Sequence, residues 1–253
     1  MQISRGRLEK AALKRPLKTS LTRRLQPTHR QKQRRAAEAG SLAILLVNEP
    51  SMRKGNPLLA YVFWHWKQAE ITAKEYENRQ RAFHAALAAA PSAGFLESFS
   101  MRLSHAPWAA GGGDAYEDWY LVQDFRALGL LNEAAVSASR AAPHHGAAAV
   151  AAGGAGGLYS LQHGATLLRQ PQVAHWFGKP EGMPYRDLFA QLAPVVEQVQ
   201  GALWMRQMVL GPAHEFCLHA AAPVSMPAVF SALVIPLRQA WSALANKGME
   251  PTH

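Results

Sequence analysis

Apolar runs alternate with amphipathic stretches along the chain, and their periods predict a mixed α+β body that begins near residue 55. Leu58–Trp66 is a run of β-forming residues and predicts a strand. Thr72–Ala90 carries apolar residues at helical spacing and ends before Pro91, so it predicts a helix. Its start also fits a capping box, because Glu75 follows Thr72 by three residues.

The rest of the first half predicts three more strands and a second helix. Gly153–Gly157 is interpreted as a flexible connector between the last helix and the last strand, because glycine disfavours both regular structures. The resulting order, β-α-β-β-α-β, is that of a ferredoxin-like unit. The predicted elements are strand Phe95–Leu103, strand Trp119–Val122, helix Phe125–Ala138 with an extension over Ala141–Ala152, and strand Leu158–Leu161.

The second half repeats this theme less completely. Trp64-His65-Trp66-Lys67 is echoed by His175-Trp176-Phe177-Gly178-Lys179, each ahead of a predicted helix, which suggests an internal repeat. No final strand is evident, because the last apolar stretch is interpreted as a helix. The predicted elements are strand Val173–Phe177, helix Tyr185–Val199, strands Ala202–Met208 and Glu215–His219, and helix Pro227–Leu244.

This order of elements resembles the dimeric α+β-barrel superfamily, in which two ferredoxin-like units pair their sheets into a barrel. The resemblance covers Leu58–Trp241 and depends on element order, not on a diagnostic motif. It implies an α+β fold of tandem ferredoxin-like repeats forming a barrel, with a pocket between sheet and helices. The superfamily includes haem monooxygenases, chlorite dismutase relatives and small isomerases, so the resemblance implies no single reaction. The missing last strand leaves closure of the barrel open.

Charge divides the chain into a basic leader and a neutral body. Residues 1–54 hold 14 Lys and Arg against three acids, whereas the remainder holds 13 basic and 14 acidic residues. The net charge of +10 therefore belongs to the leader. We expect residues 1–54 to be a disordered leader, 55–168 and 169–246 to be the two ferredoxin-like units, and 247–253 to be a loose tail.

The leader has three open interpretations. It can be an arm that contacts nucleic acid or an acidic partner through counterion release, although no aromatic residue is interleaved for base stacking. It can be a targeting segment, although the apolar run Leu42–Val47 is short and lacks a cleavage site. It can also have no role, because Met52 is a second plausible start just before the first strand.

Several classes of chemistry are absent from the sequence. The single cysteine, Cys217, excludes an internal disulfide and a thiolate metal cluster. This fits a reducing, cytoplasmic setting, or simply a protein that needs no disulfide. Phosphate-loop, nucleophile-elbow and zinc-helix motifs are missing, so no metal site is predicted. No apolar run approaches the about 20 residues of a membrane span.

Two strand histidines are the candidate catalytic residues. His65 and His175 both lie among aromatic residues on predicted first strands, where one face of the strand would point toward a pocket. Such a histidine can act as a general base or as an axial haem ligand; the alternative is a core histidine satisfied by one hydrogen bond. His144 and His145 diverge on their predicted helix and make a poor chelating pair.

Five further residues are candidates for ligand binding. Trp64, Tyr120 and Trp204 would line a pocket for a planar molecule, with a structural core role as the alternative. Arg102 and Arg206 follow methionine at comparable places in the two halves and could bind a carboxylate. The alternative for these arginines is an ion pair, with Glu117 or Asp118 among the candidate partners.

The sequence therefore supports two functional hypotheses. One is a small-molecule-binding barrel that acts on a planar, largely apolar substrate by proton transfer or by a monooxygenase-like reaction, with haem as a conceivable cofactor. The other is a non-catalytic interaction protein whose leader binds nucleic acid or an acidic partner. Either protein would be a monomer or a homodimer.

Overall fold

The computed structural model describes residues 58–109, 115–164, 171–208 and 211–242. The leader 1–54 and the tail 247–253 lie outside these residues, so their predicted disorder stays a prediction. The strands are β1 (Leu59–Lys67), β2 (Phe95–Leu103), β3 (Ala115–Val122), β4 (Ala151–Gly164), β5 (Val173–Phe177), β6 (Ala202–Arg206), β7 (Phe216–Ala220) and β8 (Leu233–Ser242). The α-helices are α2 (Ala73–Ala89), α3 (Phe125–Ala135), α4 (Ala141–Ala148) and α5 (Tyr185–Gln198).

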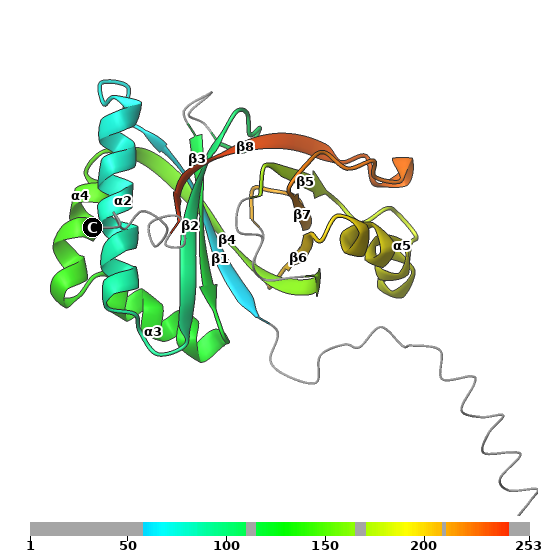
Figure 1. Ribbon diagram of the computed structural model, residues 1–253, viewed down its shortest axis with the longest axis horizontal. Helices are drawn as coiled ribbons and strands as arrows, with labels where there is room; N and C mark the ends of the chain where they lie inside the picture. Colours follow the sequence, from blue (N-terminus) through cyan, green and yellow to red (C-terminus); the bar gives the residue numbers. More distant parts are fainter. Residues whose placement is uncertain (1–57, 110–114, 165–170, 209–210, 243–253) are drawn as a thin grey trace, which may run out of the picture. The chain divides into compact units, whose positions relative to one another are not determined.

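The eight strands form one closed antiparallel barrel in the order β1-β3-β2-β8-β5-β7-β6-β4 (Figure 1). Within each half the fourth strand pairs with the first, the first with the third, and the third with the second, which is the ferredoxin-like order. Two seams join the halves, β2 with β8 and β4 with β6. The predicted fold class, tandem ferredoxin-like units forming an α+β barrel, is confirmed.

The barrel interior is a continuous aromatic and aliphatic core. Alternate residues point inward along every strand, as the period of two requires. Four tryptophans from four different strands are fully buried at the centre, where their rings contact one another and Tyr159. These tryptophans are Trp64, Trp119, Trp176 and Trp204.

The prediction of a helix over Pro227–Leu244 is wrong, because most of this segment is the last strand, β8. Among the described residues of this range, only Ala228–Phe230 is helical, as a short 3-10 turn, and β8 follows it. Ile235 and Leu237 are buried while Val234 and Pro236 are exposed, which is the alternation of a strand. Pro236 lies opposite Val173, and the neighbouring hydrogen bond between these strands is donated by the Leu237 amide to the Gln172 carbonyl oxygen. The N–H that proline lacks is therefore not needed for the pairing of β8 with β5. The strand that the sequence did not reveal is the one that closes the barrel.

The glycine run is also not a connector, because Gly153–Gly157 lies inside β4. These glycines pair with the aromatic strand β1, where Gly156 faces Phe63 and Gly154 faces His65. A Cβ atom at Gly154 would overlap the Phe63 ring, and one at Gly156 would overlap Tyr61. The glycines are therefore required because aromatic rings of β1 lie across the β4 backbone.

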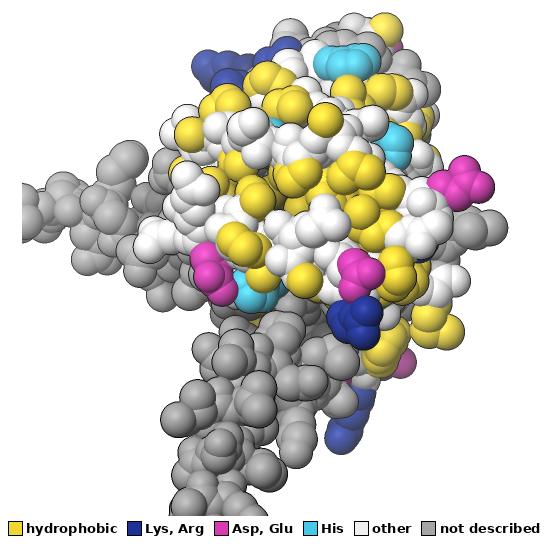
Figure 2. Space-filling view, turned by 90° about the vertical axis from the view of Figure 1, so that its right-hand side faces the viewer, with side chains coloured by type: hydrophobic (Ala, Val, Ile, Leu, Met, Phe, Trp, Pro, Cys, Tyr) yellow, Lys and Arg dark blue, Asp and Glu magenta, His cyan; other side chains and the backbone are white. Residues whose placement is uncertain are grey.

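Helices cover the two halves unequally. In Figure 1, α2, α3 and α4 lie over the first-half sheet, whereas α5 is the only α-helix on the second half among the described residues. The Thr72 side chain accepts a hydrogen bond from the Glu75 amide, so the predicted N-terminal cap of α2 is present. Figure 2 shows the face on the α5 side, where apolar side chains gather with few charged groups among them.

Within the described ranges, no helix combines the length and apolar character that a bilayer span requires.

Candidate active site

A cavity of about 890 Å³ lies between the outer face of the first-half sheet and helices α2, α3 and α4. Its walls are mostly apolar, with Phe83 and Leu87 contributed by α2. Phe125 and Val136, at the two ends of α3, line it and are half exposed, so the rim is apolar as well. This is the place between sheet and helices where the fold resemblance implies a pocket.

One wall of the cavity is a row of three rings on β1. Tyr61, Phe63 and His65 alternate along the strand and point to the helix side. Phe63 stacks on Tyr61 with centroids 6.3 Å apart and on His65 with centroids 5.4 Å apart. The glycines of β4 leave room for these rings, so the wall is a row of nearly parallel aromatic rings.

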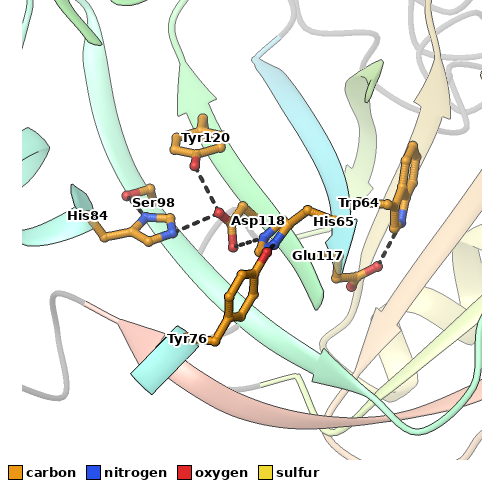
Figure 3. A network of polar contacts seen from close by, with 8 residues as sticks. All are labelled: Trp64, His65, Tyr76, His84, Ser98, Glu117, Asp118 and Tyr120. Carbon is orange, nitrogen blue, oxygen red and sulfur yellow. Dashed lines mark hydrogen bonds and ion pairs between the residues drawn. The ribbon is translucent and has the colours of Figure 1, made fainter. Parts of the chain in front are cut away.

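A buried carboxylate, Asp118 of β3, forms the polar end of the cavity (Figure 3). Its oxygens lie 3.1 Å from Nε2 of His65 and 3.1 Å from Nε2 of His84. The Tyr120 hydroxyl donates to Oδ2 at 2.9 Å. The two imidazole contacts are close but bent from ideal hydrogen-bond geometry, so their attraction is chiefly electrostatic. Asp118 and both histidines are at most 1% exposed.

The outer nitrogens of the two histidines also have partners. Nδ1 of His65 lies 2.5 Å from the Tyr76 hydroxyl, and Nδ1 of His84 lies 2.8 Å from Oγ of Ser98. A hydroxyl that donates to Nδ1 places the ring proton on Nε2, which then faces the carboxylate. We assign this tautomer to both rings because it gives Asp118 donors on each side.

Electrostatics keep Asp118 ionised. Burial alone would raise the pKa of its carboxyl group, but the adjacent His65 and His84 outweigh burial and hold that pKa well below its usual range. The pKa of Tyr120 is raised well above its usual value by burial and by the Asp118 charge. The site is therefore an anionic carboxylate between two imidazoles and a tyrosine hydroxyl in an apolar cavity.

The structure brings two of the predicted site residues together, since His65 and Tyr120 both line this cavity. Trp64 and Trp204 lie on the opposite face of the sheet, inside the barrel. There the Trp64 indole donates to Oε2 of Glu117 at 3.3 Å. These two tryptophans are core residues and do not line the cavity.

The other three predicted residues lie away from the cavity lining. His175 is on β5 in the second half, and its Nε2 accepts a hydrogen bond from the Val224 amide at 3.3 Å. Arg206 donates to the carbonyl oxygens of Gly211 and Ala213, which ties down the loop after β6. Arg102 is on β2, opposite Arg238 at the seam with β8.

Sequence reasoning missed Asp118, His84 and Tyr76 as site residues. Asp118 lies before the predicted start of the third strand at residue 119, whereas β3 begins at Ala115. Extending the alternation backward would have placed it on the same face as Tyr120. His84 and Tyr76 lie on the buried face of α2. No sequence signal shows that this face packs against Asp118.

Neither His65 nor the charge of the cavity lining fits a haem. Both nitrogens of His65 are within contact distance of Asp118 and Tyr76, so this histidine lacks a free nitrogen for iron. No Lys or Arg is among the described residues that line the cavity, so the haem carboxylates would lack cationic partners beside an anionic Asp118. The described residues also contain no cluster of three or more metal-ligating side chains.

Comparison with known proteins gives distant structural likenesses. No family model matches the chain, and no curated protein matches it. SnoaB, a cofactor-independent oxygenase from Streptomyces nogalater, is 15% identical over 40% of this chain and 90% of that chain, with a TM-score of 0.31. An anthrone oxidase-like protein is 10% identical over 73% and 91%, with a TM-score of 0.44. A putative monooxygenase from Lactobacillus acidophilus is 14% identical over 74% and 96%, with a TM-score of 0.42. These likenesses are too distant to assign an activity to this chain.

Proposed function

We propose that the first-half cavity binds a planar, largely apolar molecule with an acidic C–H or O–H group, and that His65, held by Asp118, takes the proton. The observation that carries this proposal is the buried Asp118 between two histidines at the polar end of an apolar cavity. This arrangement pairs a base with an anion that stabilises its protonated form.

The shape and the charge of the cavity support this ligand class. The stacked row of Tyr61, Phe63 and His65 is a surface on which a flat ring system can lie. The apolar rim at Phe125 and Val136 favours entry of an apolar molecule. A buried Asp118 with no Lys or Arg among the described lining residues disfavours an anionic ligand.

The proton would come to rest on His65. In the assigned tautomer, Nδ1 of His65 carries the lone pair and accepts a hydrogen bond from the Tyr76 hydroxyl. The substrate proton reaches Nδ1 through Tyr76, whose hydroxyl passes its own proton to Nδ1 as its oxygen takes the substrate proton. Nδ1–H is then the donor, and the Tyr76 oxygen is the acceptor. Asp118 stays ionised because its pKa is well below the usual range, so it stabilises the imidazolium through Nε2.

Exchange of a carbon-bound proton tests the proposal directly. The probe is 2-tetralone, a bicyclic ketone with acidic C–H groups, and proton–deuterium exchange in D2O is followed by NMR. We expect the protein to accelerate exchange, and the His65→Gln variant to lose about 100-fold of the acceleration. An oxygen electrode in the same sample distinguishes proton transfer alone from an oxygenase reaction that consumes O2.

The matched control is His175→Gln, which changes a buried histidine at a comparable place in the other half. It should exchange 2-tetralone at the wild-type rate, because His175 is not part of the cavity lining. No acceleration by the wild-type protein, or equal losses in the two variants, would contradict the proposed function.

A further inference from the structure

The cavity has a second polar group, His144 of α4, that the proton-transfer cluster does not use. Its Nδ1 is shut off from solvent and has no hydrogen-bond partner. Its Nε2 makes no hydrogen bond with any described residue, and the His144 side chain is only partly buried. One nitrogen of a histidine in the wall is therefore reachable and unpaired.

His144 and the Tyr120 ring of the carboxylate cluster both contact Phe83. The His144 ring meets the Phe83 ring edge-on with centroids 5.2 Å apart, and Phe83 lies 6.4 Å from the Tyr120 ring. The rings of His144 and Tyr120 are therefore no farther apart than these two distances together. A flat molecule of two fused rings that contacts Asp118 at one end can reach His144 with the other.

The protonation of His144 makes it a hydrogen-bond donor. Burial lowers the pKa of its imidazole, and the neighbouring His145 lowers it further, so the ring is neutral at neutral pH. A buried N–H without a partner is costly, so the proton is on Nε2 and the bare nitrogen is Nδ1. The reachable atom is thus an N–H group that lacks an acceptor.

We infer that His144 is a specificity-determining residue, whose Nε2–H donates to an oxygen at the end of the ligand farthest from Asp118. This inference rests on the proposed function and names its substrate class more closely. The ligand is a flat, uncharged molecule with oxygen at both ends, one end bound by the Asp118 cluster and the other by His144. A molecule with a single polar end would leave the His144 N–H without an acceptor.

Two matched probes test this inference. 2-Naphthol has one hydroxyl group, and 2,6-dihydroxynaphthalene has a second hydroxyl at the opposite end of the same ring system. Binding of each is measured by fluorescence titration against the wild-type protein and the His144→Phe variant. We expect the variant to bind the diol about tenfold more weakly, or about 1.4 kcal/mol, and to bind 2-naphthol as tightly as the wild type does.

Two further variants separate a hydrogen bond from a structural effect. His144→Gln keeps an N–H donor and should retain the preference for the diol. His145→Phe changes the exposed neighbour on the same helix, which is outside the cavity lining, and should change neither affinity. Unchanged 2-naphthol affinity in His144→Phe also shows that the cavity is still folded.

The outcomes distinguish this inference from the function on which it rests. If the wild type binds both probes but His144→Phe weakens them equally or not at all, the role of His144 is wrong and the proposed function stands. If neither probe binds to the wild type, the cavity does not take planar apolar molecules and both proposals fail. Loss of the diol preference in His144→Phe alone supports the inference.

Discussion

The two halves of the barrel have the same strand order but different space between sheet and helices. In the first half this space is a cavity with a buried carboxylate, whereas in the second half α5 packs directly on the sheet. The helix-facing residues account for the difference. On β3 they are Tyr116, Asp118 and Tyr120, and on β7 they are Phe216, Leu218 and Ala220.

Strand order alone therefore does not make a site. In the second half, Leu188, Leu192 and Val196 of α5 fill the space over Leu203 and other apolar side chains of the sheet. In the first half, glycines and alanines of β4 and α4 leave the space open. The fold provides a place between sheet and helix in each half, and apolar side chains of α5 occupy that place in the second half.

The largest expected effect comes from removing the charge that distinguishes the first half. Asp118→Asn takes the anion away from His65, His84 and Tyr120, and we expect it to lower the free energy of unfolding by about 3–5 kcal/mol. Urea unfolding at neutral pH measures this loss. Leu218→Ala is the control in the other half, because it creates a cavity without disturbing any charge.

The pH dependence sharpens the same comparison. The pKa of Asp118 is lower in the folded protein than in the unfolded chain, where it is about 3.9. Between these two pKa values the unfolded chain binds more protons than the folded protein does. The contribution of Asp118 to the free energy of unfolding is therefore complete above about pH 4 and is lost as the pH falls further. Unfolding curves across this range should show a smaller acid-induced loss for Asp118→Asn than for Leu218→Ala. Equal losses would contradict the assigned charge state.

An intermediate effect is expected at the glycine strand. Gly154→Ala introduces a Cβ that would overlap the Phe63 ring, so the aromatic wall must shift into the cavity. We expect a loss of about 1–3 kcal/mol in thermal or urea unfolding and weaker binding of 2-naphthol. Gly178→Ala is the matched control, because no atom lies within 4 Å of its added Cβ. An unaltered 2-naphthol affinity in Gly154→Ala would show that the wall tolerates displacement.

The smallest effect is expected in the second half. His175→Leu removes the acceptor for the Val224 amide, which is a single partly buried hydrogen bond. We expect a loss of about 1 kcal/mol in the free energy of unfolding, measured with urea. A loss of several kcal/mol in the free energy of unfolding would contradict this expectation. It would mean that His175 stabilises the second half as strongly as Asp118 and its contacts stabilise the first half.

Sequence periodicity predicted the elements whose pattern is local. Leu58–Trp66 and Tyr185–Val199 agree with β1 and α5 to within one residue at each end. Sequence periodicity failed for segments whose structure depends on pairing with a strand far away in the sequence. Gly153–Gly157 is a strand because β1 brings rings that need the room, and Leu233–Ser242 is a strand because β2 and β5 offer two open edges.

The candidate site shows the same limit. His65 and Tyr120 were predicted because strand alternation among aromatic residues is visible in the sequence. Asp118 was considered only as a partner for arginine, and its actual partners come from β1 and α2. Asp118 lies more than 30 positions from both His65 and His84, so only the pairing of β1 with β3 and the packing of α2 on the sheet show that they meet.

The β2–β8 and β4–β6 seams have a consequence for how the cavity responds to dilution. When two separate chains close a barrel, its integrity depends on their concentration by mass action. Here both seams lie within one chain, so each half meets the other at a fixed effective concentration set by the connecting segment. The ring of strands around the first-half cavity is thus assembled by a unimolecular step, and it stays closed however scarce the protein becomes.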